Sequence, residues 1–241
     1  MRAMTDTFTV RHYDSLGSTN DEAWRLARDG APHGSVIHAD EQTAGRGRLA
    51  RTWFSPPGNL YVSIVLRPEM PPARTPELSF VAAIAVADTV AALLPKRLRP
   101  HLKWPNDVLV EGAKISGILL ESDADVAILG IGLNVLEAPM SGIYKTTTIA
   151  ANGGLASVDS ARDILLARLG DGLGLWRRDG FAAVRDAWLA WSYPIGETIR
   201  VNASGAAREG KFAGLDETGA LLLETTAGIE RHVTGDVALR G

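Results

Sequence analysis

Cysteine is absent from this 241-residue chain. The absence excludes disulfide bonds, thiolate metal ligands and thioester chemistry, and it is compatible with a reducing cytosol. An excess of positive charge is also lacking, because 25 lysines and arginines are set against 28 acidic residues, giving a net charge of -3. The sequence therefore provides no broad positive field for nucleic acid, and any basic cluster must act locally.

A long hydrophobic run is missing as well. The longest apolar stretch, residues 80–94, is interrupted by Asp88, and residues 1–7 form no apolar signal core. We therefore expect a cytoplasmic protein without a membrane span. The five histidines are scattered, with no H-E-x-x-H motif and no pair at helical spacing, so we expect no metal held by protein side chains.

Arginine and glycine are concentrated between residues 41 and 53. They are Gly45, Arg46, Gly47, Arg48 and Arg51. Guanidinium groups on so pliable a backbone can fold closely around a phosphate or carboxylate. Repulsion among the arginines should keep this arginine loop mobile until an anion binds. Gln42 and Trp53 flank it with an amide that can read a polar edge and a ring that can cover an apolar ligand.

Two other interpretations of this stretch were weighed. A single Arg-Gly-Arg is equally typical of a solvated basic loop. The letters from Gly45 to Ala50 also fit the dinucleotide fingerprint G-x-G-x-x-A, which must open a helix. Residues 52–58 contain two adjacent prolines and a glycine, so no helix can follow, and we reject the fingerprint.

Two further clusters combine cations with turn residues. Lys103-Trp-Pro-Asn-Asp107 and Lys114-Ile-Ser-Gly-Ile-Leu119 lie close together in the sequence, and Gly130-Ile-Gly-Leu-Asn134 follows them. Glycine at the end of a strand more often marks a bend than a ligand, so the last motif alone is weak. Three such clusters in one chain are nevertheless hard to explain as ordinary surface.

Hydrophobic periodicity predicts the secondary structure. Strands are expected at residues 8–13, 35–39, 59–66, 97–103, 108–110, 115–121 and 126–133, and helices at 76–93, 157–180 and 181–191. Another helix should begin at Ser18-Thr19-Asn20, where Thr19 and Glu22 fit a capping box, and on local grounds these residues serve only as a cap. Residues 144–154 are expected to form a polar surface segment.

Tight turns between the strands from residue 97 to 133 force antiparallel neighbours. The sequence therefore predicts an α+β fold, with a mixed, mainly antiparallel sheet and helices packed on one face. After residue 196 four short apolar runs separated by glycine and aspartate predict a small β-barrel. We expect two domains, residues 1–193 and 194–241.

The ordered set of motifs resembles bacterial biotin protein ligase, also called biotin-[acetyl-CoA-carboxylase] ligase. The similarity runs from about residue 13 to 135, and residues 235–240 are similar to the SH3-like C-terminal domain of that family. The resemblance implies a catalytic domain like that of class II synthetases. It also implies the monofunctional type, because too few residues precede Ser18 for an N-terminal DNA-binding domain.

In this family biotin and ATP give biotinyl-5′-AMP, and a lysine of a biotin carboxyl carrier protein then accepts the biotin. The resemblance thus implies ATP and Mg²⁺, with the metal bound mainly by phosphate oxygens, and no protein-held metal. The implied partners are biotin and the carrier domain, without nucleic acid or membrane. A monomer and a homodimer through the catalytic-domain sheet both stay open as assemblies.

The resemblance also assigns roles to residues. The implied biotin-binding residues are Ser18, Thr19, Asn20, Gln42, Gly45, Arg46, Gly47, Arg48, Lys114, Gly117 and Gly132. The implied ATP and adenylate ligands are Arg48, Arg51, Trp53, Asn106, Asp107, Lys114 and Asn134. Lys114, Arg48 and Arg46 form the expected catalytic set, since two reacting anions need cations beside them.

One residue departs from the family pattern, and two alternatives stay open. Family members commonly have glycine where this chain has Ala50, so a stiffer loop with altered kinetics is expected. Lipoate protein ligase is the enzymatic alternative, because it resembles biotin ligase in fold and adenylation chemistry. A non-catalytic biotin-sensing or biotin-binding module is the alternative of a different class.

Overall fold

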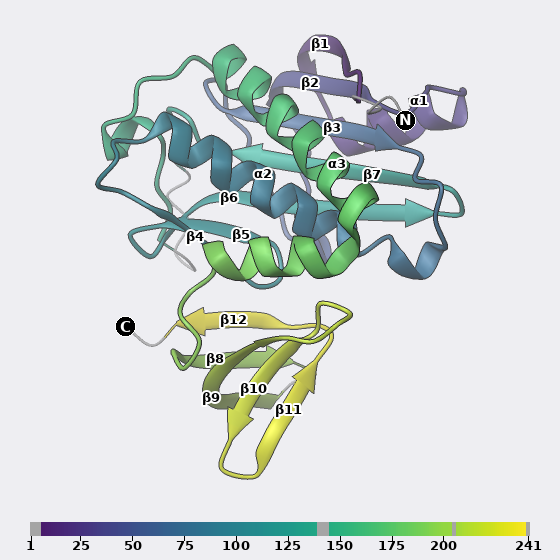
Figure 1. The fold of residues 1–241 in the computed structure, drawn as a ribbon. Helices are drawn as coiled ribbons and strands as arrows, with labels where there is room; N and C mark the ends of the chain where they lie inside the picture. Colours follow the sequence, from purple (N-terminus) through teal and green to yellow (C-terminus); the bar gives the residue numbers. More distant parts are fainter. Residues whose placement is uncertain (1–5, 139–144, 204–205, 240–241) are drawn as a thin grey trace.

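The computed structural model describes residues 6–138, 145–203 and 206–239 (Figure 1). A seven-stranded sheet has the order β1-β2-β3-β7-β6-β5-β4. Its strands are β1 (Thr9–Leu16), β2 (Ser35–Gln42), β3 (Leu60–Leu66), β4 (Pro100–Lys103), β5 (Asp107–Val110), β6 (Ala113–Asp123) and β7 (Val126–Leu133). β1 and β2 are parallel and the remaining pairs are antiparallel, which confirms the predicted mixed sheet.

β3 lies in the interior of this sheet, and all seven of its residues are buried. Successive side chains of a strand point to opposite faces, so a continuous apolar run implies cover on both faces. Val62 and Ile64 belong to the core cluster with α2 (Glu77–Leu93) and α3 (Val158–Trp191), whereas Val65 belongs to a second cluster.

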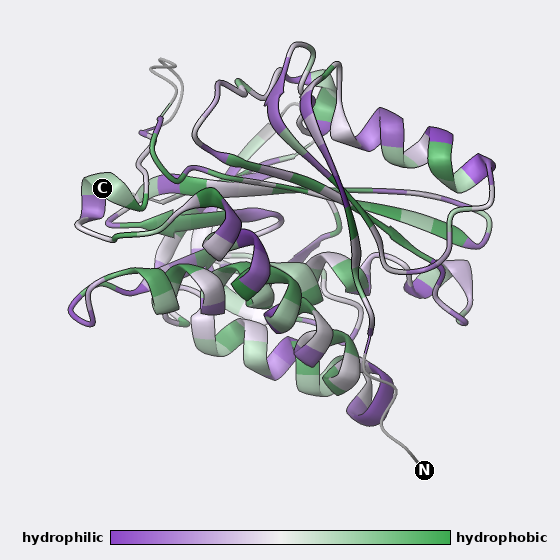
Figure 2. Ribbon diagram, turned by 90° about the horizontal axis from the view of Figure 1, so that it is seen from above, coloured by the Kyte–Doolittle hydropathy of each residue, from purple (hydrophilic) through white to green (hydrophobic). Residues whose placement is uncertain are grey.

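Helices cover both faces of the large sheet, as Figure 2 shows. α2 and α3 pack against each other on one face, while α1 (Thr19–Arg28) contacts β2, β3 and β7 on the other. Its buried residues Ala23, Leu26 and Ala27 provide the apolar stripe for that contact. The prediction that helices pack on one face was therefore wrong for α1.

The helical segment Pro72–Leu93, which includes α2, is long and apolar enough by composition to cross a membrane. In the fold the residues of α2 form the core between the large sheet and α3. A helix that is apolar all round is typical of such a buried position. α3 contains the predicted break, because Gly180 adopts a non-helical conformation with φ of 75°.

A five-stranded sheet forms the C-terminal part, in the order β11-β10-β9-β8-β12. Its strands are β8 (Thr198–Ala203), β9 (Ala206–Leu215), β10 (Leu221–Thr225), β11 (Gly228–His232) and β12 (Asp236–Leu239). The sequence predicted the first four and missed β12, which has four residues and pairs with β8. We keep the division after residue 193 as a proposal.

The C-terminal sheet is attached to the larger one by buried polar contacts. Lys103 Nζ donates to the carbonyl of Val237 at 3.1 Å, and Trp104 Nε1 donates to that of Gly219 at 3.1 Å. Figure 1 shows β12 on the side that faces the large sheet. The Lys-Trp motif thus fixes the small sheet beside the strands that carry the other motifs.

Candidate active site

A cavity of about 410 Å³ lies where these motifs meet. The predicted residues that line it are Ser18, Thr19, Asn20, Gln42, Arg46, Gly47, Arg48, Arg51, Trp53, Asn106, Asp107, Lys114, Gly117, Gly132 and Asn134. Gly45 is the predicted site residue outside the lining. It is buried, its carbonyl accepts from Trp53 N at 2.9 Å, and a Cβ there would lie 2.5 Å from the carbonyl oxygen of Trp53. Gly45 therefore closes the base of the arginine loop.

One end of the cavity is a hydrogen-bonding cluster. The Oε1 of Gln42 accepts from the backbone N of Thr19 at 2.8 Å and from its hydroxyl at 3.0 Å. The N-cap of α1 is Ser18, which accepts from Asp21 N at 3.5 Å. The N-cap is therefore one residue earlier than the predicted Thr19 capping box, and the Thr19 hydroxyl binds Gln42 at the cavity wall instead of capping α1.

Asn20 is buried beside this cluster. Its Oδ1 accepts from Ser63 Oγ at 2.6 Å, and a Cβ at Gly130 would overlap that same oxygen. A side chain at position 130 would collide with the amide of Asn20. Gly130, the first glycine of the motif Gly130–Asn134, therefore has a packing role. Sequence reasoning missed Ser63, although a lone serine in a fully buried strand must have a hydrogen-bond partner.

The other end of the cavity is cationic. Lys114 Nζ lies 2.6 Å from Asp107 Oδ1, and Lys103 Nζ lies 3.1 Å from Oδ2 of the same carboxylate. Burial alone would raise the pKa of Asp107, but the two ammonium groups outweigh it and hold that pKa below its ordinary value. Asp107 therefore stays ionised and fixes Lys114 at the cavity wall.

Each loop arginine has a different partner. Arg48 Nη1 donates to Asn106 Oδ1 at 3.0 Å, and Arg51 Nη2 lies 2.6 Å from Asp236 Oδ2. Arg46 donates to Glu121 at 2.9 Å and to Asp21 at 2.6 Å. In this structure each arginine is held by a different acceptor side chain, so mutual repulsion does not determine the position of the loop.

Trp53 lies against the glycines of two neighbouring strands. A Cβ at Gly132 would be 2.5 Å from Trp53 Nε1, and one at Gly117 would be 2.9 Å from its Cζ3. Lys114 Nζ lies 5.2 Å from the centre of the indole ring, within cation–π range. The absence of side chains at Gly117 and Gly132 therefore makes the space that the indole uses.

Six buried side-chain polar atoms lack a hydrogen-bond partner within the described parts of the chain, and two of them, Trp53 Nε1 and Asn134 Oδ1, belong to residues that line the cavity. A buried orphan donor or acceptor is costly, so each of these two is suited to a ligand. Asn134 Nδ2, in contrast, donates to the carbonyl of Thr147 at 3.1 Å.

The segment after residue 144 is less superficial than expected. Lys114 N donates to the carbonyl of Lys145 at 2.8 Å, and Thr148 and Ile149 are buried. Tyr144 lies outside the described residues. The prediction of a surface segment was wrong for Thr148 and Ile149, while Lys145 is exposed and supports the strand that carries Lys114 through its backbone.

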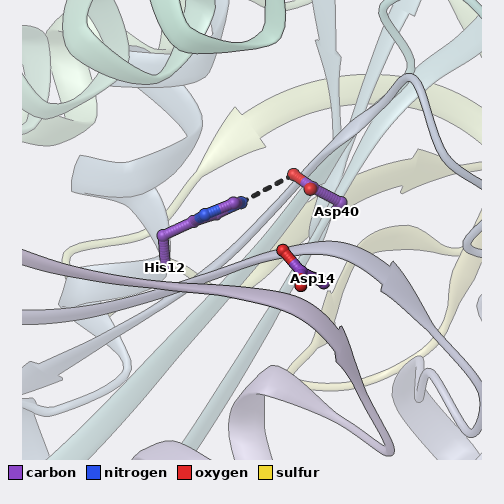
Figure 3. Close-up of side chains that lie close together, drawn as sticks. All are labelled: His12, Asp14 and Asp40. Atoms are coloured by element: carbon purple, nitrogen blue, oxygen red, sulfur yellow. Dashed lines mark hydrogen bonds and ion pairs between the residues drawn. The ribbon is translucent and has the colours of Figure 1, made fainter.

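A separate group of chelating side chains lies on the outer strands β1 and β2 (Figure 3). His12, Asp14 and Asp40 could each offer one ligand atom, all within 4.8 Å of one another. His12 Nε2 and Asp40 Oδ1 are 2.8 Å apart, and about half of each of these side chains is exposed. An exposed pair of this kind contributes at most about 1 kcal/mol, and these residues are separate from the cavity lining.

The chain matches two protein-family models. Residues 13–135 match the biotin/lipoate A/B protein ligase family, and residues 195–240 match the biotin protein ligase C-terminal domain. Together they span the large sheet with its cavity and the small C-terminal sheet. The second match carries information that the first lacks, because the first family also includes lipoate ligases.

Individual relatives agree with these matches. The chain is 37% identical over 223 residues to biotin-[acetyl-CoA-carboxylase] ligase of Paracoccus denitrificans, covering 88% of this chain and 92% of the relative. It is 35% identical over 243 residues to the bifunctional ligase/repressor BirA of Bacillus subtilis, covering 95% of this chain and 73% of the relative.

A solved structure extends the similarity to three dimensions. The biotin protein ligase of Aquifex aeolicus in complex with biotin and ATP superposes with a TM-score of 0.84 at 29% identity. The match covers 96% of this chain and 98% of that structure, so it includes both sheets. The chain therefore belongs to the biotin/lipoate A/B protein ligase family and, within it, to the biotin protein ligases.

Proposed function

We propose that this chain is an ATP-dependent ligase that converts biotin to biotinyl-5′-AMP and transfers the biotin to one lysine of a biotin carboxyl carrier protein. The acceptor would belong to acetyl-CoA carboxylase or a related carboxylase. The observation that carries the proposal is one cavity with hydrogen-bonding groups at one end and Lys114, fixed by Asp107 at 2.6 Å, at the other.

The two ends suit the two ends of biotin. Ser18, Thr19 and Gln42 supply hydroxyl and amide groups that match the donors and acceptors of a ureido ring. The space beside Gly117 and Gly132, which the indole of Trp53 fills in this state, would take the apolar rings and tail once the indole moves aside to cover them. The biotin carboxylate then points toward Lys114.

In the first step a carboxylate oxygen of biotin attacks the α-phosphorus of ATP. A new P–O bond forms, and the bond to pyrophosphate breaks with its electron pair leaving on pyrophosphate. Two anions must approach, so Lys114 and Arg48 would offset their repulsion and stabilise the charge that grows on the α-phosphate. Arg51 and Asn106 would contact the nucleotide part.

In the second step the neutral amine of the acceptor lysine attacks the carbonyl carbon of biotinyl-5′-AMP. The amide C–N bond forms, AMP leaves with the electrons of the C–O bond, and the nitrogen loses a proton to solvent. Water would hydrolyse the mixed anhydride, so the arginine loop would serve to exclude it.

Mg²⁺ is proposed to arrive with ATP. The buried Oδ1 of Asn134 is a hard oxygen ligand without a partner in the described chain, which fits a cation held mostly by phosphate oxygens. Asp107 is already neutralised by two lysines and is a poorer candidate. When bound, the metal would neutralise phosphate charge.

The remaining partners are proposals as well. β1 is an edge strand with mostly exposed residues, so pairing of two large sheets would give a homodimer, measurable by light scattering. The net charge of -3 favours no specific DNA binding, which fluorescence anisotropy on promoter DNA would check. The absence of cysteine is compatible with action in the cytoplasm.

Biotin-dependent exchange of labelled pyrophosphate into ATP tests the proposed activity. The purified chain should support exchange with biotin and not with lipoate. Exchange with lipoate alone would favour the lipoate ligase alternative, and tight biotin binding without exchange would favour a non-catalytic biotin-binding module. Transfer of biotin to a purified carrier domain, followed by mass spectrometry, tests the second step.

A further inference from the structure

Glu121 of β6 connects the arginine loop to α1. Its Oε1 accepts from Arg46 Nη1 at 2.9 Å, and its Oε2 accepts from Asn20 Nδ2 at 2.9 Å. Arg46 Nη2 and Trp24 Nε1 add bonds to Oε2 at 3.3 and 3.2 Å. One carboxylate thus binds three side chains from two separate segments.

The connection continues through the polar end of the cavity. Ser63 Oγ lies within hydrogen-bond distance of Asn20 Oδ1, at 2.6 Å, and of Thr19 Oγ1, at 2.7 Å. Thr19 donates to Gln42, whose Nε2 donates to Ser55 Oγ at 2.9 Å. The network therefore begins at one end of the arginine loop, crosses the biotin-binding candidates, and returns to the chain just after Trp53.

The network is shielded from water at its inner end and reaches the surface at its outer end. Asn20 and Thr19 are each 4% exposed and Ser63 is fully buried, whereas the side chains of Glu121 and Arg46 are 26% and 39% exposed. Donors outweigh burial at Glu121 and lower its pKa, so the group is an anion at neutral pH. Hydrogen bonds to a charged group in such surroundings are about twice as strong as neutral ones.

Arg46 has little capacity left for a reacting anion. Its guanidinium contacts the carboxylates of Glu121 and Asp21, so its positive charge is already compensated. Lys114, in contrast, shares the single carboxylate of Asp107 with Lys103, so a net positive charge remains at the cavity wall. Arg46 is better placed to anchor the loop than to stabilise the transferred phosphate.

We propose that Glu121 is a positioning residue for biotin binding, which holds Arg46 and Asn20 so that the arginine loop and the Thr19–Gln42 pair keep the shape of the biotin site. The inference rests on the proposed function for its ligand. It assigns Arg46, expected among the catalytic cations, to the same anchoring unit.

The test variant is Glu121→Gln, which keeps the size of the side chain and removes its charge. The KM for biotin in pyrophosphate exchange should rise by about tenfold, since the variant replaces the charge-assisted bonds from Arg46 and Asn20 with neutral ones. The kcat should change much less, and Glu121→Asp should restore part of the affinity. Glu22→Gln is the matched control, because Glu22 also binds an arginine, Arg25, but lies outside the cavity lining.

Two further measurements separate positioning from general stability and from failure of the proposed function. Amide hydrogen exchange of residues 43–53 should be faster in Glu121→Gln than in the parent without any ligand. The variant Arg46→Gln should raise the KM similarly, and the double variant should be no worse than the worse single variant. The role of Glu121 would be overturned by an unchanged KM for biotin together with unchanged amide hydrogen exchange of the loop, or by KM increases that multiply in the double variant.

If the parent shows no pyrophosphate exchange, the proposed function fails. The amide hydrogen exchange of residues 43–53 still tests the anchoring by Glu121 in that case.

Discussion

Arg51 and Asp236 form an ion pair between the arginine loop and the C-terminal sheet, with 2.6 Å between Nη2 and Oδ2. The two residues are 185 positions apart in the sequence, and both line the cavity. The small C-terminal sheet therefore supplies part of the cavity wall and holds the distal end of the loop.

The variant Asp236→Asn should weaken nucleotide binding more than biotin binding. Without the carboxylate, Arg51 loses this ion pair to the C-terminal sheet, and we expect the KM for ATP to rise by about three- to tenfold, as for a partly exposed ion pair worth about 1 kcal/mol. Pyrophosphate exchange at a series of ATP concentrations measures this KM. Asp125→Asn, which removes an exposed partner of Arg67 at 3.6 Å, is the control. An ATP dependence equal to that of the parent would argue against this coupling of the domains.

Lys114→Ala should impair adenylation far more than folding. A cation that stabilises charge in the transition state typically contributes about a hundredfold to a thousandfold in rate. Asp107 keeps Lys103 as its counter-ion at 3.1 Å, so the variant leaves no unpaired buried charge. The exposed neighbour Lys145→Ala serves as control. Equal exchange rates for Lys114→Ala and the parent would remove Lys114 from the mechanism.

Gly132→Ala tests the space used by Trp53. The added methyl group would lie 2.5 Å from Trp53 Nε1, so the indole must move. Overpacking of this kind costs about 1–3 kcal/mol, and we expect biotin affinity to fall by roughly tenfold. Gly170→Ala, whose new atom meets Phe8 at an ordinary 3.6 Å, should leave affinity unchanged. Calorimetric titration with biotin distinguishes the outcomes, and full affinity in Gly132→Ala would contradict this packing argument.

Much of this site could be predicted because its residues occur in dense local motifs. The turn residues and cations near Arg48, Asn106 and Lys114 mark loops and strand ends directly in the sequence. Glu121 could not be found this way, since an acidic residue near the end of a strand is typical of an exposed position. Its partners Arg46 and Asn20 are brought to it only by the sheet order.

The fold shows the same limit. The continuous apolar run of β3 predicts burial on both faces, but it does not say which helix covers which face. The placement of α1 opposite α2 and α3 depends on the parallel pairing of β1 with β2, which no local turn specifies. β12 was missed because residues 235–240 were interpreted only as part of the similarity to the C-terminal domain, and not as a strand.

Acid sensitivity should involve Asp216 in the C-terminal sheet. Burial alone would raise its pKa, but donors from Arg231, Thr218 and Ala220 lower it to about 2. The unfolded value is about 3.9, so the ionised group stabilises the fold above about pH 4, and this contribution is lost as the pH falls from about 4 to 2.

Asp216→Asn should reduce that dependence on pH. The free energy of unfolding at neutral pH should fall by about 2 kcal/mol, and the difference between variant and parent should shrink below pH 4. Urea unfolding followed by circular dichroism from pH 2 to 7 gives both values. Glu217→Gln, a substitution of its exposed neighbour, is the control. A constant difference across that range would contradict the assignment.

The variant Ala50→Gly tests how backbone strain affects the mobility of the arginine loop. The φ of Ala50 is 57°, in the left-handed region that glycine adopts more easily, and Leu49 before it has φ of 56°. Ala50→Gly removes strain of about 1–2 kcal/mol but gives the unfolded chain more freedom, so stability should change by less than about 1 kcal/mol. The loop itself should become more mobile.

Limited trypsin digestion measures the mobility of the loop, because trypsin cleaves after arginine and Arg48 and Arg51 flank the strained turn. Cleavage after these residues should be faster in Ala50→Gly than in the parent, and biotin with MgATP should slow it in both proteins. Ala124→Gly is a matched control, since Ala124 has φ of 48° in the exposed turn between β6 and β7, away from the cavity. It should change stability similarly and leave cleavage in the loop unchanged. If the ligands give no protection in either protein, the loop does not close over the adenylate, because closure removes the peptide bonds beside Arg48 and Arg51 from the protease.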